Sequence, residues 1–172
     1  MVYLFHSENM TSADNQQERL KIEGWLTGFT DGEGCFSVSF IKNKTAKSGW
    51  QIFPEFVITQ GEKSLQALKL FQEYFKCGRI FANRRHDNHS KNLYRFCVRS
   101  IKDLQSKIVP FFEKNELRTT KKKDFEMFSK IIGEMSNRNY LSKKGATKIA
   151  KIIEKMNRKK KSRFLKSSET TR

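Results

Sequence analysis

The chain has 172 residues, 35 of them Lys or Arg against 18 Asp or Glu, and its formal charge at pH 7 is +17. Such an excess favours a polyanionic partner, either nucleic acid or an anionic membrane surface. No apolar run approaches the ~20 residues of a membrane span, no secretory leader is apparent, and the three scattered cysteines lack metal-ligand spacing. We therefore expect an intracellular protein without a membrane partner.

The apolar pattern alternates between helical spacing and the two-residue spacing of strands. In chain order it predicts a helix over 18–31, strands over 35–42 and 50–60, a helix over 64–75, strands over 78–85 and 93–99, and helices over 101–114, 121–135 and from Ser142 onward. The first seven elements follow the order αββαββα. This order predicts an α+β fold, with one antiparallel sheet packed by helices on one face and further helices at the C-terminus.

The same pattern suggests one domain between two flanking segments. Residues 1–17 are expected to be an N-terminal extension, residues 18–157 the single domain, and residues 158–172 a basic C-terminal tail. A chain of this length has room for one core of useful size.

The strand face opposite the helices is rich in hydrogen-bonding and cationic side chains. Arg suits guanine edges, Asn and Gln suit adenine, Glu suits the cytosine amino group, and apolar rings suit thymine methyls. Strands can present such an array to a major groove. The expected DNA contacts are Ser37, Ser39, Gln51, Phe53, Glu55, Arg79, Phe81, Asn83, Arg85, Arg95, Cys97 and Arg99.

The first helix carries a stripe of small residues. Gly24, Gly28 and Gly32 recur at spacing four, with Thr27 beside them. Each Gly in a helix interior costs roughly 1 kcal/mol relative to Ala, so three of them need a reason. Close packing against a second helix is such a reason, and the chain has no other segment of this kind. We therefore expect a homodimer in which this face, together with Asp31, contacts its own copy about a two-fold axis.

Two acids stand at the end of this helix, where the helix dipole disfavours negative charge. Asp31 and Glu33 from two copies would gather four carboxylates at the dimer axis. Crowded carboxylates bind cations, and oxygen donors favour Mg²⁺, with Ca²⁺ or Mn²⁺ as substitutes. An acidic metal centre on a basic protein suggests phosphodiester hydrolysis.

Residues 26–34, Leu-Thr-Gly-Phe-Thr-Asp-Gly-Glu-Gly, resemble the nine-residue motif of LAGLIDADG homing endonucleases. The segments 56–60, 75–80, 110–112 and 121–125 resemble later parts of that family, so that the resemblance covers roughly residues 20 to 135. The resemblance is to the single-motif, homodimeric members encoded by group I introns. It implies a saddle-shaped sheet and a metal-dependent double-strand cut in a long, nearly palindromic DNA target, with short 3′ overhangs.

The resemblance also implies roles for individual residues. Glu33 and the carbonyl of Gly32 would hold the metal, and Asp31 would cap the partner helix at the catalytic centre. Gln60 would orient the attacking water, and Lys121 would stabilise charge at the scissile phosphate. Lys122 or Lys123 could take the place of Lys121 if the helix register differs. Prototypes often carry Asp where this chain has Glu33, and we expect activity with either acid.

Two alternatives stay open. The first is an RNA maturase that helps its own intron fold, which the basic tail would suit. The second is a DNA-binding regulator of the same fold that has lost cleavage, against which Glu33 and Gln60 argue. The host compartment would be an organelle (chloroplast or mitochondrion) or a bacterial cytoplasm.

Overall fold

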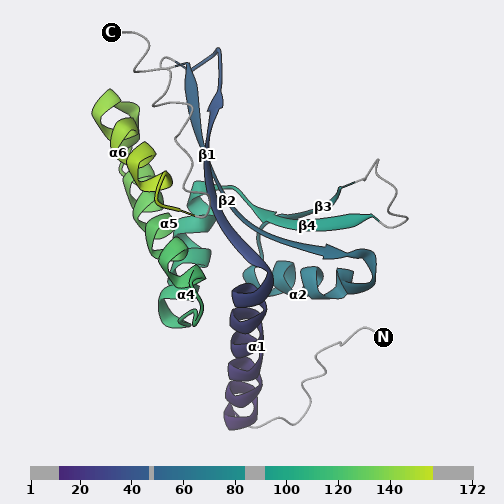
Figure 1. Ribbon diagram of the computed structural model, residues 1–172. Coiled ribbons are helices and arrows are strands. Elements are labelled where there is room, and N and C mark those ends of the chain that lie inside the picture. The colour runs from purple at the N-terminus through teal and green to yellow at the C-terminus, as the bar shows by residue number, and fades with distance from the viewer. Residues whose placement is uncertain (1–11, 47–48, 84–91, 157–172) are drawn as a thin grey trace.

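The computed structural model describes residues 12–46, 49–83 and 92–156. Figure 1 shows these elements: α1 (Ser12–Glu33), β1 (Gly34–Lys42), β2 (Trp50–Gly61), α2 (Leu65–Phe75), β3 (Arg79–Asn83), β4 (Leu93–Val98), α3 (Ile101–Asp103), α4 (Val109–Lys114), α5 (Lys121–Ser136) and α6 (Lys143–Ile153). A short 3₁₀ turn, Glu62–Ser64, precedes α2, and a π-helical segment, Leu104–Ile108, joins α3 to α4. Within these ranges no helix is both long and apolar enough to cross a membrane.

The four strands form one sheet in the order β1-β2-β4-β3, and every neighbouring pair is antiparallel. The sheet is strongly bent, with α2 beneath its right half and α4, α5 and α6 on its left, while its other face is open (Figure 1). The expected α+β class, the αββαββα order and the one-sided helical layer are confirmed. The loop of the first hairpin lies between Lys42 and Trp50, as predicted.

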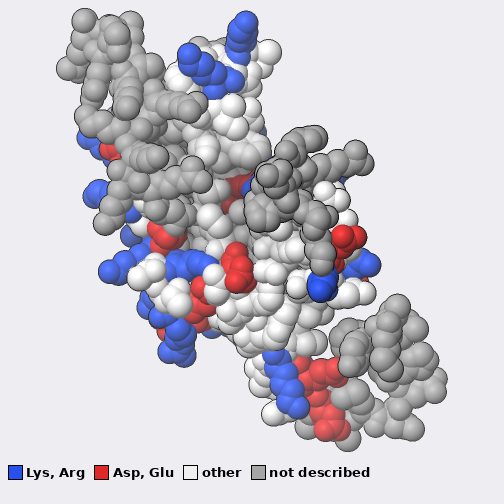
Figure 2. Space-filling model, turned by 45° about the vertical axis from the view of Figure 1, so that its right-hand side comes forward, with Lys and Arg blue, Asp and Glu red and all other residues white. Residues whose placement is uncertain are grey.

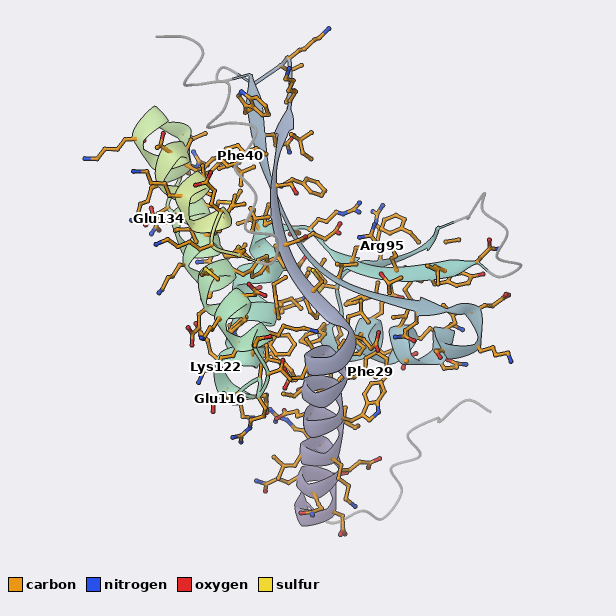
Figure 3. The ribbon with its side chains drawn as sticks, viewed as in Figure 1. Phe29, Phe40, Arg95, Glu116, Lys122 and Glu134 are labelled. Carbon is orange, nitrogen blue, oxygen red and sulfur yellow. The ribbon has the colours of Figure 1, made fainter. Side chains whose placement is uncertain are left out.

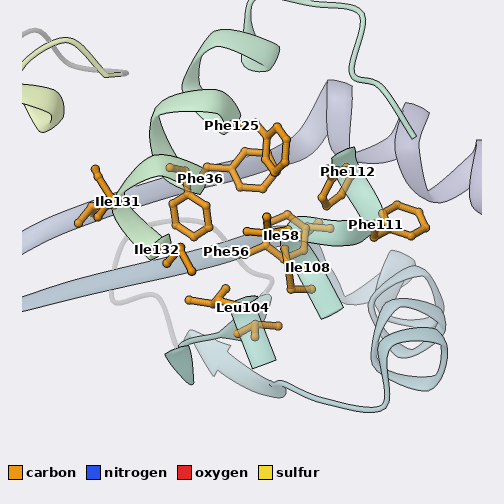
Figure 4. Close-up of a cluster of buried hydrophobic side chains, with 14 of the residues drawn as sticks. Phe36, Phe56, Ile58, Leu104, Ile108, Phe111, Phe112, Phe125, Ile131 and Ile132 are labelled. Atoms are coloured by element: carbon orange, nitrogen blue, oxygen red, sulfur yellow. The ribbon is translucent and has the colours of Figure 1, made fainter. Parts of the chain in front are cut away.

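Phenylalanine rings fill the space between the sheet and the helices. Phe36 of β1 and Phe56 of β2 lie opposite each other with ring centroids 5.1 Å apart, and both are fully buried. Phe112 of α4 and Phe125 of α5 pack on them from the helical side, with centroids 5.4 Å and 5.3 Å from that of Phe36 (Figure 4). Phe, Ile and Leu from both hairpins and from the helices therefore share one core.

Two helices differ from their predicted extent. α1 begins at Ser12 rather than at residue 18, because residues 12–17 contain no helix breaker although they lack an apolar stripe. Part of the predicted N-terminal extension is therefore helical; residues 1–11 and the predicted tail lie outside the described residues. The helix over 101–114 contains the π segment because Pro110 has no amide hydrogen for the carbonyl of Ser106.

Three apolar residues lie at positions where helical or strand spacing favours burial, and yet they are exposed. Leu20 and Trp25 of α1 are 53% and 41% exposed, because only part of this helix touches the sheet and the other helices. Ala82 is exposed as well, although it pairs with Tyr94 on the inner face, because β3 is an edge strand.

A buried carboxylate ties α1 to the other helices. Glu23 is only 2% exposed and accepts hydrogen bonds from Arg19 Nε at 2.8 Å, Tyr74 Oη at 2.8 Å and Lys114 Nζ at 3.0 Å. Burial by itself would raise the pKa of Glu23, but the bonds from Arg19, Lys114 and Tyr74 outweigh it and lower the pKa to about 2. Glu23 thereby joins α1 to α2 and α4.

Replacing Glu23 should destabilise the fold in a pH-dependent way. Because the folded pKa lies below the usual value of 4.5, this stabilisation is complete above pH 4.5 and is lost as the pH falls toward 2. Glu23→Gln should lower the free energy of unfolding by about 2–3 kcal/mol at pH 7, and the gap to the unmodified protein should narrow below pH 4.5. Urea unfolding measured from pH 7 to pH 3 tests this, with the exposed Glu73→Gln as control. A gap that stays constant over this range would contradict the assignment.

Candidate active site and nucleic-acid interface

The junction between α1 and β1 leaves no room for a side chain at Gly34. The helix runs to Glu33 and the strand begins at the next residue. A Cβ placed on Gly34 would lie 2.6 Å from Cγ2 of Thr30 and 2.8 Å from its carbonyl oxygen. A larger residue at this position would push the strand away from the helix. Gly34 therefore fixes where the last turn of α1, with Asp31, Gly32 and Glu33, sits relative to the sheet.

Lys121, the first residue of α5, reaches the end of α1. Its Nζ donates to the carbonyl oxygens of Thr30 at 2.9 Å and Gly32 at 3.2 Å. Carbonyls in the last turn of a helix have no partner within the helix and lie at the negative end of its dipole, so they attract a cation. Burial lowers the pKa of Lys121, although the nearby groups of Cys35, Asp31 and Glu33 act in the opposite direction.

The next lysine, Lys122, has a different partner. Lys122 pairs with Glu116, and Figure 3 shows these two side chains together at the start of α5. Lys123 is exposed. Of the three candidates, Lys121 is the one that reaches the corner at Glu33.

Asp31 holds the loop in front of α5. Its carboxylate accepts hydrogen bonds from the backbone N–H of Arg118 at 2.6 Å, the N–H of Thr119 at 3.1 Å and the hydroxyl of Thr119 at 2.6 Å. Burial raises the pKa of Asp31, but the bonds from Thr119 and Arg118 together bring it below its usual value. Asp31 therefore caps the loop of its own chain, and the expectation that it caps a partner's helix stays a prediction.

Glu33 and Gln60 flank this corner. Glu33 is exposed on the last turn of α1, next to the Gly32 carbonyl. Gly34 pairs with Ile58, so Gln60 lies two residues further along β2, roughly 7 Å beyond the first residue of β1. Among the described residues no three His, Cys, Asp or Glu side chains gather as a metal site. One chain thus offers the Glu33 carboxylate and the Gly32 carbonyl oxygen here, while the Asp31 carboxylate bonds to the loop before α5.

The open sheet face carries most of the predicted polar set. In the antiparallel register Ser37 lies opposite Glu55, Ser39 opposite Phe53, Arg79 opposite Cys97, and Phe81 opposite Arg95. Figure 3 shows Arg95 extending from the sheet on the side away from α2. The side chains exposed or partly exposed on this face are Ser37, Ser39, Gln51, Phe53, Arg79, Phe81, Arg95 and Arg99.

Two members of the predicted set are not accessible. Glu55 is 6% and Cys97 is 3% exposed, because the neighbouring strands bring larger side chains over them. Glu55 is moreover paired with Arg95 at 2.9 Å and with Arg99 at 2.5 Å. The prediction that Glu55 and Cys97 contact bases directly is therefore wrong, because both side chains are covered. Asn83 ends β3, and Arg85 lies outside the described residues.

Cationic side chains continue beyond the centre of the sheet. Figure 2 shows Lys and Arg at the top of the molecule, where the β1–β2 hairpin ends, and along its left edge. At the hairpin these are Lys42 and Lys44, both exposed. Asn43 also donates its side-chain amide to Gln51 Oε1 at 3.1 Å, which orders the base of the loop.

The glycine stripe of α1 faces open space. Gly24, Gly28 and Gly32 are exposed, and a Cβ added at any of them would meet nothing within 4 Å. Thr27 donates its hydroxyl to the carbonyl of Glu23 at 2.7 Å, so its methyl contributes to the same small-residue surface.

Sequence reasoning missed several residues of this site. Arg118 and Thr119 were not singled out, because backbone donors of a loop have no sequence signature. Thr59, opposite Arg95 on the open face, was also missed as a surface residue, although strand alternation could have found it.

Known proteins resemble this chain over most of its length. Residues 26–132 match the sequence pattern described as LAGLIDADG endonuclease. Probable intron-encoded endonuclease 2 of Neurospora crassa is 33% identical over 126 residues, which are 73% of this chain and 27% of that protein. The chain therefore spans about a quarter of the length of this relative.

Two solved structures resemble this chain over most of its length. The crystal structure of the homing endonuclease I-TnaI is 37% identical, with a TM-score of 0.75, over 87% of this chain and 97% of that one. The structure of I-SmaMI bound to an uncleaved DNA target in the presence of calcium ions is 29% identical, with a TM-score of 0.76, over 86% of this chain and 48% of that one.

Breaking the contact between Asp31 and the loop should loosen the whole corner. Asp31→Asn replaces an acceptor of three donors by a group with only one acceptor oxygen, so that we expect a loss of about 2 kcal/mol in unfolding free energy. Asp103→Asn is the control, because Asp103 has a 3.4 Å ion pair with Lys107 along the helix surface and should change stability by less than about 1 kcal/mol. Equal losses in denaturant unfolding of the two variants would contradict the anchoring role of Asp31.

Proposed function

The chain belongs to the LAGLIDADG endonuclease family, and from this premise we propose that it is a homing endonuclease that makes a site-specific double-strand cut in DNA. The observation that carries the proposal is the corner formed by Glu33, the Gly32 carbonyl and Lys121, which lies at the edge of an open polar sheet. The target would be long and nearly palindromic, the products would carry short 3′ overhangs, and a homodimer would do the cutting.

The donor set at the corner fits a hard divalent cation. Glu33 offers a carboxylate and Gly32 offers a carbonyl. That carbonyl already accepts a hydrogen bond from the ammonium group of Lys121. Oxygen donors without His or Cys favour Mg²⁺, for which Ca²⁺ or Mn²⁺ could substitute. When bound, such an ion supplies charge stabilisation at the phosphate and lowers the pKa of a bound water. Because one chain brings only two of these donors, a second copy would complete the site.

The remaining residues of the corner have separate tasks in this proposal. Lys121 would stabilise the charge that develops on the scissile phosphate, and its ammonium is held in place by Thr30 and Gly32. Gln60 would orient the attacking water with its side-chain amide. Asp31 acts indirectly, since it fixes the loop that leads into Lys121.

The exposed face of α1 supports the homodimer. Helices approach closely where side chains are small, and the stripe of Gly24, Gly28 and Gly32 has open space above it. Joining two copies along this face would bring both Glu33 side chains together and place the two sheets side by side. A two-fold arrangement of this kind matches a nearly palindromic target.

The proposed setting follows from the kind of relative. The matched Neurospora protein is named as intron-encoded, and we infer that this chain acts on the DNA of a gene that a group I intron can enter. It would work inside the cell, in an organelle or a bacterial cytoplasm. Its own intron RNA stays a predicted additional partner.

Glu33→Gln should abolish cutting while leaving DNA binding intact. The variant keeps its shape but loses the charge that would hold the cation, so that cleavage of intronless-allele DNA in Mg²⁺ should fall by more than about 100-fold. Binding to the same DNA is measured in parallel, and Glu62→Gln, an exposed acid after β2, is the control. If Glu33→Gln cuts as well as the control does, the metal assignment is wrong.

Gly28→Leu should prevent dimer formation without harming the monomer. A Cβ at Gly28 meets nothing within 4 Å in a single chain, and the added side chain would occupy the space that a partner helix needs. Sedimentation should show a dimer for the unmodified protein and a monomer of unchanged helical content for Gly28→Leu. Gly133→Leu on α5, where a Cβ also finds open space, is the matched control. A Gly28→Leu protein that sediments as a dimer would refute this interface.

A further inference from the structure

A buried acid lies at the centre of the open sheet face. Glu55 of β2 is 6% exposed, although it points to the same side of the sheet as the exposed Ser39. Its Oε1 accepts from Arg95 Nη2 at 2.9 Å, and its Oε2 accepts from Arg99 Nε at 2.5 Å. On a surface that is proposed to bind a polyanion, one acid thus takes up the charge of two arginines. It weakens the general attraction for phosphate and needs another reason to be there.

Arg99 is held from two further sides. Its guanidinium carbon lies 5.3 Å from the ring centroid of Phe53 on β2 and 5.3 Å from that of Phe81 on β3. Arg99 follows directly after β4, which runs between β2 and β3, so the two rings approach its guanidinium from the two neighbouring strands. Contacts between a cation and an aromatic face are attractive and direction-dependent, so the rings restrain both the place and the plane of the group.

The bond to Glu55 engages the Nε atom of the Arg99 guanidinium. Arg99 uses Nε for its ion pair with Glu55, its guanidinium also interacts with the buried Cys97, and the side chain is 41% exposed. Arg95 differs, since it gives one terminal nitrogen, Nη2, to the same carboxylate. Two parallel N–H donors on one edge match the O6 and N7 acceptors of guanine in the major groove.

We propose that Arg99 is a preorganised guanine-reading residue in each half-site of the target, and that Glu55 is the positioning residue that holds it. The inference rests on the proposed function, because it needs DNA against the open face. An arginine that is already fixed loses little side-chain freedom when it binds, and a fixed fork rejects bases that lack the matching acceptors. Glu55 therefore lowers the general affinity for DNA and raises the selectivity at one base pair.

The test is a base-by-base profile of the target. Each base pair of the half-site is changed in turn, and cutting and binding are measured for the unmodified homodimer, Arg99→Lys and Glu55→Gln. One G·C pair should be preferred by roughly 10- to 100-fold in the unmodified protein. Arg99→Lys keeps the charge but loses the fork, so it should flatten the preference at this pair and leave the other positions unchanged.

Glu55→Gln distinguishes a positioning role from a purely structural one. It should flatten the profile at the same base pair as Arg99→Lys, and it should bind unrelated DNA as tightly as the unmodified protein or more tightly, because a negative charge is removed from the face. The control is Glu73→Gln, which removes the same charge from the exposed side of α2 and should leave the profile as it was. Phe81→Leu, which removes one flanking ring at an exposed position, should show a weaker version of the Glu55 effect.

The outcomes separate this inference from the proposed function. If the unmodified protein cuts its target and Arg99→Lys leaves every position unchanged, the guanine assignment is overturned. If Glu55→Gln reduces discrimination equally at all positions, its role is structural and the positioning claim fails. If the unmodified protein neither binds nor cuts the intronless-allele DNA, the proposed function fails and this inference fails with it.

Discussion

The link between the end of α1 and the start of α5 is the constraint on which the site depends. Asp31 fixes the backbone of Arg118 and Thr119, and Lys121 from the same turn returns to the carbonyls of Thr30 and Gly32. These contacts join segments almost ninety residues apart and leave Glu33 exposed beside them. Gly34 completes the corner, since only a residue without a Cβ lets β1 leave the helix there. The chemistry of the site is thus held by backbone groups as much as by side chains.

The two surfaces of this molecule use their charges in opposite ways. On the helical side a buried Glu23 gathers Arg19, Tyr74 and Lys114 and ties helices together. On the open side a buried Glu55 gathers Arg95 and Arg99 where a ligand can still reach them. In both cases a buried acid orders longer cationic side chains, and removing the acid would leave those cations without their partner. The formal charge of +17 therefore does not measure the attraction of the sheet face.

Much of the architecture could be predicted because local patterns report on burial. Alternation along 35–42 and 50–60 identified the paired strands, and the apolar spacing of 121–135 identified α5 to within one residue. The motif at 26–34 pointed to the corner with Glu33. The sequence limited the lysine at this corner to three consecutive residues, 121–123, but did not select one of them. Failures occurred where a pattern has two meanings: Trp25 and Leu20 fit an apolar helical stripe, yet they are exposed because much of α1 extends away from the core.

By itself the sequence determined the fold class, the order of the elements, the family and the residue types available at the corner. These depend on periodicity and on short motifs, which are properties of neighbouring residues. Only the tertiary structure decided that Asp31 serves its own chain, that Lys121 rather than Lys122 meets the helix end, and that Glu55 is covered and paired. Each of these depends on groups distant in sequence, and on competition among several acids and bases for the same partners. Such competition is settled by distances and burial, which one-dimensional spacing does not contain.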